Sequence, residues 1–170
     1  MPSVRCADAK RRPLSPLALD IGTHTWLLGR WTRGGPAKIA DGATSDDPAQ
    51  VIHDIAAALA EDRAFAAIAR GDESLGCAFA GVVDPAGEVT GWLAHPSWVG
   101  FRLAQMLKAF VAGGGVVIRP ESVCAAEGDA LLSACHGEGV EHEGVEDRPS
   151  SQPQWSTLLG AFLTGGRLAP

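Results

Sequence analysis

Apolar residues recur with two different spacings along this chain, and the alternation of the two limits the possible folds more than any other feature. Short apolar runs, which are typical of buried strands, predict strands at residues 17–22, 26–31, 75–80, 89–93 and 116–118. Apolar residues at helical spacing predict helices at residues 47–65, 103–110 and 123–132. Strands that alternate with helices favour an α/β domain with a central sheet.

Turn-forming residues separate these segments. Asp47 followed by Pro48 is typical of a helix start, because proline is tolerated in the first helical turn. The segment 84–88, Asp-Pro-Ala-Gly-Glu, has the composition of a hairpin turn. A run of three glycines at 113–115 is expected to close the helix before it.

Composition places the chain among small soluble domains. Its 170 residues, of which 46% are apolar, can bury one core, which predicts a single domain. The net charge of −6 gives no support for binding to nucleic acid. No apolar run approaches the ~20 residues of a membrane span, and no signal peptide is visible, so we expect a cytoplasmic protein with no membrane partner.

The cysteines give no sign of a disulfide framework or a metal site. They lie far apart in the sequence, without a CxxC pair or the spacing of metal ligands, at positions Cys6, Cys77, Cys124 and Cys135. We therefore expect reduced thiols, as is usual for a protein of the cytosol.

Four segments differ in composition and predict the organisation of the chain. Residues 1–16 are polar, basic and rich in proline, which predicts a flexible leader. Residues 17–135 carry the α/β pattern. In residues 136–154 acidic residues alternate with glycine and histidine, which predicts a disordered acidic linker. Residues 155–170 are apolar with several glycines and are expected to supply one more strand.

The first strand ends in a motif that suits phosphate chemistry. Asp20-Ile21-Gly22 follows the apolar run directly. A glycine turn brings backbone N–H groups close to phosphate oxygens, and a carboxylate beside it can hold Mg²⁺ through water. The same three residues can also form a turn with a structural role alone.

Four segments, in order, resemble motifs of the ROK (repressor, open reading frame, kinase) family of sugar kinases, a branch of the hexokinase and actin superfamily. Residues 20–24 resemble its phosphate-binding Asp-Ile-Gly-Gly-Thr, and residues 78–84 resemble its Gly-x-Pro-Gly-x-Val-Asp turn. Residues 94–100 resemble its sugar-contacting Asn-x-Pro-x-Trp-x-Gly segment. Residues 118–130 resemble Val-x-Asn-Asp-Ala-Asn-Ala-Ala-x-x-Gly-Glu-Ala, so the resemblance covers residues 17–132.

The resemblance implies a fold and an activity. The fold would be a ribonuclease H-like α/β lobe with a central mixed sheet, the amino-terminal lobe of a two-lobed kinase. The activity would be ATP-dependent phosphorylation of a hexose or amino-hexose, with ATP and Mg²⁺ as cofactors. The residues implied to face phosphate and Mg²⁺ are Asp20, Gly22, Thr23 and Thr25. The residues implied to face the sugar are Gly81, Ala94, His95 and Glu121.

The sequence departs from the family at the catalytic position. Where the family has an Asn-Asp pair, whose aspartate removes the proton from the sugar hydroxyl, this chain has Glu121 and Ser122. A serine hydroxyl is a far weaker proton acceptor than a carboxylate of pKa ~4. Glu121, a longer acid one position away, is the possible substitute. Ala94 replaces the family's sugar-contacting asparagine and cannot form its hydrogen bonds.

The end of the sequence matches the family only loosely. Residues 156–168 resemble its second phosphate motif, but Leu158 and Leu159 bring side chains where the family brings bare backbone. The family's sugar clamp, zinc site and adenosine-binding half would follow Pro170. We therefore expect a chain that is inactive alone, and that self-associates or pairs with a separate carboxy-terminal lobe.

Other functions remain open. The lobe could bind sugar or act as a scaffold without catalysis, as a pseudokinase does, or the chain could be a degraded gene product. Trp98 could stack on a sugar or plug the domain surface, and His95 could be a ligand or an exposed loop residue. His136 and His142 could hold a divalent ion, although a solvated linker is the simpler account. Cys124 is most simply a small core residue.

Overall fold

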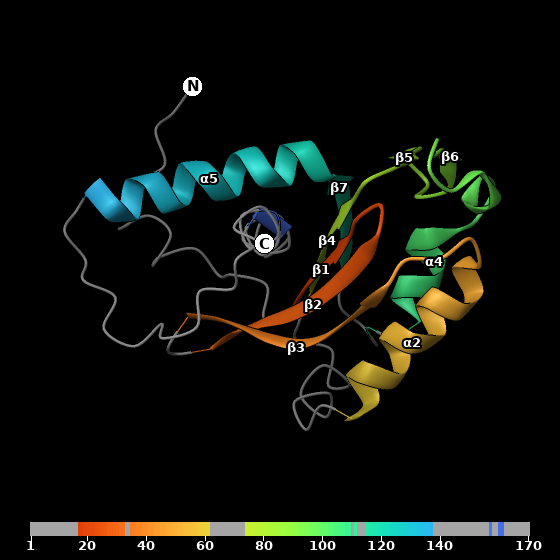
Figure 1. The fold of residues 1–170 in the computed structure, drawn as a ribbon, viewed down its shortest axis with the longest axis horizontal. Coiled ribbons are helices and arrows are strands. Elements are labelled where there is room, and N and C mark those ends of the chain that lie inside the picture. The colour runs from red at the N-terminus through yellow and green to blue at the C-terminus, as the bar shows by residue number, and fades with distance from the viewer. Residues whose placement is uncertain are drawn as a thin grey trace.

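The computed structural model describes residues 17–32, 35–61, 74–109, 111, 115–137, 157, 160 and 161. A five-stranded mixed sheet with strand order β3-β2-β1-β4-β7 forms the centre of this part of the chain (Figure 1). Strands β1, β4 and β7 run parallel, and β2 and β3 extend the sheet antiparallel on one side. The strands are β1 Leu17–Ile21, β2 Thr25–Thr32, β3 Gly35–Ala43, β4 Leu75–Phe79 and β7 Val116–Pro120.

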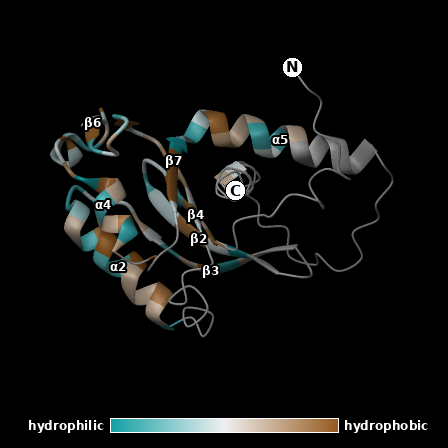
Figure 2. Ribbon diagram, turned by 180° about the vertical axis from the view of Figure 1, so that it is seen from behind, coloured by the Kyte–Doolittle hydropathy of each residue, from teal (hydrophilic) through white to brown (hydrophobic). Residues whose placement is uncertain are grey.

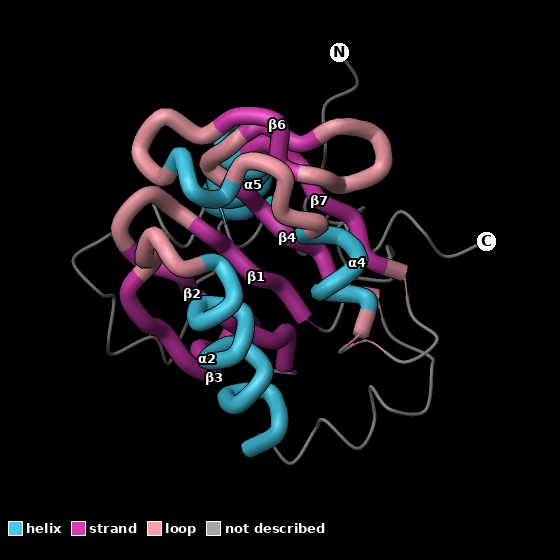
Figure 3. The backbone as a smooth tube through the Cα atoms, turned by 90° about the vertical axis from the view of Figure 1, so that its right-hand side faces the viewer, coloured by secondary structure: helices cyan, strands magenta, loops and turns pink. Residues whose placement is uncertain are grey.

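Helices cover both faces of the sheet. Helices α2 and α4 lie on one side, and α5 lies on the other, as Figures 1 and 3 show. A small hairpin of β5 and β6 stands at the end of the sheet near the start of α5 (Figure 1). These elements are α2 Pro48–Glu61, β5 Val82–Val83, β6 Val89–Gly91, the short 3₁₀ helix η1 Pro96–Trp98, α4 Leu103–Lys108 and α5 Glu121–Gly137.

The core explains why the strongest strand predictions hold. Strands β1 and β4 are buried along their whole length, because both lie inside the sheet with helices over its faces. Their sequences are therefore apolar runs, interrupted by Asp20 in β1, and Figure 2 shows hydrophobic residues along the central strands. Cys77 and Cys124 are buried and are not joined to any cysteine of the described residues by a disulfide, so Cys124 is a small core residue as expected.

Helix α2 begins where the sequence indicates. The Asp47 carboxylate oxygen Oδ1 accepts the backbone N–H groups of Ala49 at 3.0 Å and Gln50 at 3.1 Å, which are left free in the first turn of a helix. The apolar side of helix α2 packs against the sheet through Val51, Ile52, Ile55 and Leu59. The expected extension of this helix to residue 65 lies outside the described residues.

Strand β3 was not expected from the sequence. Among the described strands it pairs with β2 alone, at the edge of the sheet, and its register shifts between Leu28 and Gly29 of that partner. An edge strand faces water along one side, so it tolerates charged residues such as Lys38 and Asp41, which form an ion pair of 3.0 Å. These residues hide the strand from a search for apolar runs.

Most other boundaries differ from expectation by one or two residues, and those of β6 and α5 affect the predicted organisation of the chain. Strand β6 ends at Gly91, short of the predicted limit at residue 93. Helix α5 starts two residues early and ends at Gly137, inside the segment predicted as a linker. The strand expected in residues 155–170 is wrong where the structure describes that segment, because Thr157, Gly160 and Ala161 are helical and buried. A Cβ atom on Gly160 would lie 1.8 Å from the Cys124 carbonyl oxygen, so the missing side chain permits this helical packing.

The leader at 1–16, residues 138–154 of the linker and most of the segment at 155–170 lie outside the described residues. Within the described part of the chain, no helix combines the length and apolar character needed to cross a bilayer.

Candidate functional site

The carboxyl ends of the three parallel strands meet at one edge of the sheet. Ile21 of β1 pairs with Phe79 of β4, and Phe79 pairs with Pro120 of β7. The residues that follow, Gly22 and Glu121 among them, therefore leave the sheet along the same edge. In open α/β sheets, ligands bind beyond this edge of the strands.

A tight turn joins β1 to β2 at this edge. The Gly22 N–H donates to the Thr25 carbonyl oxygen at 3.0 Å. A Cβ on Gly22 would lie 3.2 Å from that oxygen, so a side chain would crowd the turn. The turn gathers the predicted phosphate-side residues Asp20, Gly22, Thr23 and Thr25 within six consecutive positions of the chain.

Asp20 lies in β1, just before the turn, and is a buried carboxylic acid. Its side chain is 4% exposed, and among the described residues its Oδ1 atom has no hydrogen-bond partner. Burial, and then the negative charge of Glu121, raise the pKa of Asp20 from 3.8 to about 7. A buried carboxylate without a partner is costly, so this oxygen is stabilised by any cation that can reach it.

Glu121 points toward the same turn from the start of α5. Its Oε1 atom is 4.0 Å from the position that a Cβ on Gly22 would occupy. The carboxylate also raises the pKa of Asp20. Ser122, the next residue, is exposed. The structure thus places the possible substitute acid beside the phosphate-side turn, and the serine is exposed.

Replacing Glu121 tests this arrangement. We expect Glu121→Gln to lower the pKa of Asp20 below about 7, because one negative neighbour is removed. The pKa should stay above 3.8, because burial is the larger cause of the shift. NMR titration of the Asp20 carboxyl carbon measures this, with Ser122→Ala as the control that leaves the pKa unchanged. An unchanged pKa of Asp20 in Glu121→Gln would show that the charge of Glu121 does not act on Asp20.

An open cavity of about 720 Å³ lies beside the turn. It brings together Thr23, predicted for phosphate, and Gly81 and Ala94, predicted for sugar. Most of the lining is apolar, and Ala94 offers no hydrogen-bonding side chain. The lining residues are Thr23, Ala80, Gly81, Val82, Gly91, Trp92, Leu93, Ala94, Pro96 and Val99.

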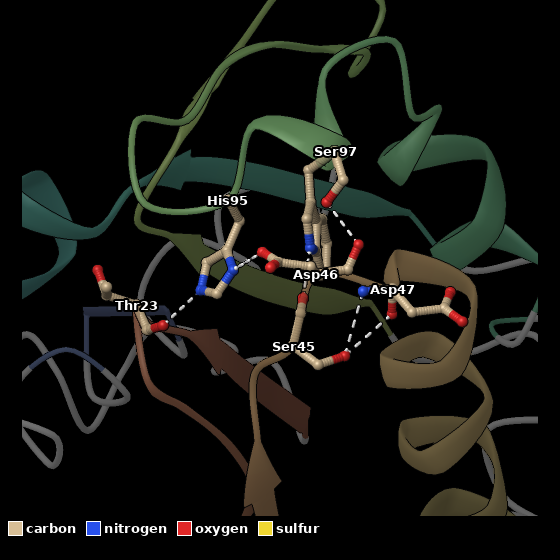
Figure 4. A network of polar contacts seen from close by, with 7 residues as sticks. Thr23, Ser45, Asp46, Asp47, His95 and Ser97 are labelled. Atoms are coloured by element: carbon tan, nitrogen blue, oxygen red, sulfur yellow. Dashed lines mark hydrogen bonds and ion pairs between the residues drawn. The ribbon is translucent and has the colours of Figure 1, made fainter.

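His95 does not behave as an exposed loop residue. Its side chain is only 13% exposed, and both ring nitrogens make hydrogen bonds (Figure 4). Nε2 lies 2.6 Å from the Thr23 carbonyl oxygen, and Nδ1 lies 2.7 Å from the Asp46 carboxylate. Sequence reasoning missed Asp46, because it lies 49 positions from His95 and no motif includes it.

Trp98 takes the structural role of the two considered. Its side chain is fully buried, and the indole N–H donates to the Ser45 carbonyl oxygen at 2.8 Å. The ring packs among Phe79, Trp92 and Phe101. It therefore anchors the segment after β6 on the loop before α2 and presents no face to a sugar.

Comparison with known proteins gives a fold. No family model and no curated protein matches the sequence. Among solved structures, a ROK family glucokinase from Streptomyces griseus, in complex with glucose and AMPPNP, matches with a TM-score of 0.55 and 23% identity over 72% of this chain. ROK hexokinase from Thermus thermophilus matches with a TM-score of 0.51 and 18% identity over 68% of this chain.

A ROK family protein from Streptococcus pneumoniae, in complex with sucrose, also matches, with a TM-score of 0.51 and 17% identity over 68% of this chain. The chain spans about 38% of the length of each of these three structures. The resemblance predicted from the four motifs is thereby confirmed at the level of the fold: the described lobe has the mixed-sheet α/β fold of ROK sugar kinases.

Proposed function

We propose that this chain supplies the phosphate-binding lobe of an ATP-dependent hexose kinase. The turn after β1 would face the nucleotide phosphates through Gly22, Thr23 and Thr25, and Asp20 would hold Mg²⁺ through water. The observation that carries the proposal is the buried Asp20 oxygen that lacks a hydrogen-bond partner among the described residues, at the ligand-binding edge of the sheet. A hydrated cation would satisfy that oxygen.

The charge of the site favours a metal-bound phosphate over a bare one. Asp20 and Glu121 place two carboxyl groups beside one turn, and two negative charges would repel a phosphate. Within the described residues, no group of three or more histidine, cysteine or acidic side chains could hold a metal ion. A Mg²⁺ ion here would therefore take its remaining ligands from phosphate oxygens and water, as is common for this ion. When bound, it would neutralise charge on the transferred phosphoryl group.

The sugar would lie in the cavity beside the turn. The Streptomyces griseus protein was solved with glucose and the Streptococcus pneumoniae protein with sucrose. By this likeness, a hexose or amino-hexose would contact the cavity wall that includes Gly81 and Ala94. The position of Glu121 near Gly22 supports it, in place of Ser122, as the group that would accept the hydroxyl proton.

Binding without catalysis is a second candidate. The exposed Ser122 stands where the family has its base, and the apolar cavity wall at Ala94 offers no hydrogen bond to a polyol. Release of ADP from Mg–ATP that depends on glucose would favour the kinase. Glucose binding in calorimetry without that release would favour the second candidate.

The first test concerns the nucleotide. We expect Asp20→Ala to bind Mg–ADP at pH 8 at least about tenfold more weakly than the unmodified chain, because a hydrogen bond to a charged group contributes ~1.5–3 kcal/mol. Isothermal calorimetry with the purified chain measures the affinity. Circular dichroism should stay nearly unchanged.

The matched control removes a carboxylate from the surface. Asp129 is exposed on α5, so Asp129→Ala should bind Mg–ADP as the unmodified chain does. Equal affinity in Asp20→Ala and the unmodified chain would remove the phosphate-site assignment. Equal losses in both variants would mean that net charge, and not Asp20, controls binding.

A further inference from the structure

We propose that His95 is a positioning residue, which holds the turn after β1 in the shape that binds phosphate by fastening the Thr23 carbonyl to the loop before α2. The inference rests on the proposed function of that turn. Its evidence is the placement of one imidazole ring between two segments that lie far from it in sequence (Figure 4).

The two contacts of the ring demand that both nitrogens carry hydrogen. The Thr23 carbonyl oxygen can only accept, so Nε2–H donates to it at 2.6 Å. The ionised Asp46 carboxylate also only accepts, and it lies 2.7 Å from Nδ1. Either neutral tautomer would set a nitrogen lone pair against an oxygen, so the imidazolium form fits the site and a neutral ring does not.

The surroundings of the ring agree with this requirement. The Thr23 carbonyl first, and then the Asp46 carboxylate, raise the pKa of His95, while burial opposes them. The other titratable groups on the segments packed against His95 are His24 in the turn and Asp47 in the loop. Asp47 Oδ1 is occupied in capping α2. Asp46 is therefore the charged partner of the ring within the described residues, and it is 77% exposed, so solvent screens the pair.

Hydrogen bonds from groups that do not titrate hold the segment around His95 to the loop before α2. The Ser97 hydroxyl donates to the Asp46 carbonyl oxygen, and the Trp98 indole N–H donates to the Ser45 carbonyl oxygen. The Trp92 ring packs edge-on to His95, with 4.7 Å between ring centroids. Loss of the imidazole should therefore free the Thr23 carbonyl, while the hydrogen bond from the Thr44 N–H to the His24 carbonyl oxygen and the segment from Trp92 to Trp98 stay in place.

Fixing the Thr23 carbonyl also fixes the next backbone donor. The peptide group is planar and trans, so the N–H of His24 points opposite to the Thr23 C=O. While His95 holds that carbonyl, the His24 N–H is kept facing away from the imidazole. A turn that binds phosphate through backbone N–H groups needs such orientation before the ligand arrives.

The experiment compares the unmodified chain with His95→Ala. Calorimetry measures Mg–ADP affinity from pH 5.5 to 8.5, and hydrogen exchange measures the amides of the turn without any ligand. We expect about tenfold weaker binding in His95→Ala at pH 6.5, where the imidazole of the unmodified chain is charged. We also expect about tenfold faster exchange of the turn amides. His53→Ala, which removes an exposed histidine from α2, is the control and should change neither.

The pH profile separates His95 from Asp20. Binding should strengthen as Asp20 ionises near pH 7 and weaken as His95 loses its proton, so the two groups act in opposite directions. His95→Ala, which already binds about tenfold more weakly at pH 6.5, should show no further loss of affinity at high pH and should keep the gain near pH 7. Asp46→Asn, which keeps the shape of the side chain, should move that loss to lower pH, because the imidazolium loses its negative partner.

The measurements on His95→Ala can overturn the role of His95 separately from the proposed function. Equal affinity, pH profile and exchange in His95→Ala and the unmodified chain would overturn the inference. If the unmodified chain binds no Mg–ADP at any pH, the proposed function fails instead. In that case, faster exchange of the turn amides in both His95→Ala and Asp46→Asn still supports His95 as the residue that holds the turn, and unchanged exchange overturns it.

Discussion

Replacing Asp20 by asparagine is expected to stabilise the fold by about 4 kcal/mol more at pH 8 than at pH 4, in the absence of divalent cations. Burial raises the pKa of this carboxyl from 3.8 to about 7, so the folded chain binds a proton that the unfolded chain releases between these values. Stability contributed by the protonated form is complete below pH 3.8 and is lost as the pH rises toward 7. Asparagine cannot ionise and avoids that loss.

Denaturant unfolding at the two pH values, with EDTA present, measures the difference. The comparison between pH values isolates the charge, since any packing cost of the asparagine amide is the same at both. Asp129→Asn, on the exposed face of α5, is the control and should show no such pH dependence. An equal change in Asp20→Asn at pH 4 and pH 8 would show that the carboxyl titrates as in the unfolded chain.

This prediction links stability to the proposed site. A carboxylate that costs about 4 kcal/mol when ionised is a poor choice for stability alone. The same substitution that stabilises the fold should weaken Mg–ADP binding by at least about tenfold. A stabilised variant that still binds the nucleotide would assign Asp20 a structural role only.

Replacing Gly87 by alanine should cost about 3 kcal/mol of unfolding free energy, against about 1 kcal/mol for Gly100→Ala. Both glycines have positive φ, of 80° and 87°. A Cβ on Gly87 would lie 2.1 Å from the Cβ of Ala104 at the start of α4, whereas nothing lies within 4 Å of a Cβ on Gly100. The two variants share the backbone strain, and only Gly87→Ala adds the collision.

Urea unfolding of the two variants measures the difference. Gly87 is held at this spot from both sides: its carbonyl accepts the Ala104 N–H at 3.0 Å, and the Asp84 carboxylate accepts the N–H groups of Ala86 and Glu88 at 2.9 Å. The hairpin turn has little room to move away. Equal losses of unfolding free energy in the two variants would mean that α4 moves away from the new side chain without a cost in stability.

The sequence by itself determined the strands that are buried on both faces and the helix and turn whose signals are local. Strands β1 and β4 are buried on both faces, so all of their residues except Asp20 are apolar or small, and the runs are visible without knowledge of their neighbours. Helix α2 carries its own start signal in Asp47, since a cap acts within one turn. The turn after β1 was also predictable, because glycine permits the close approach of Gly22 to Thr25.

Only the tertiary structure decided what surrounds that turn. Strand β3 owes its existence to pairing with β2, because its own residues are those of a solvated edge. Glu121 reaches Asp20 because β7 and β1 flank β4 in one sheet, a proximity that no local pattern encodes. His95 meets Asp46 and Thr23 because the segment after β6 packs on the turn after β1 and on the loop before α2, across 49 and 72 positions of the chain. Local patterns report which side chains are buried, whereas the partners of a buried charge depend on how distant segments pack.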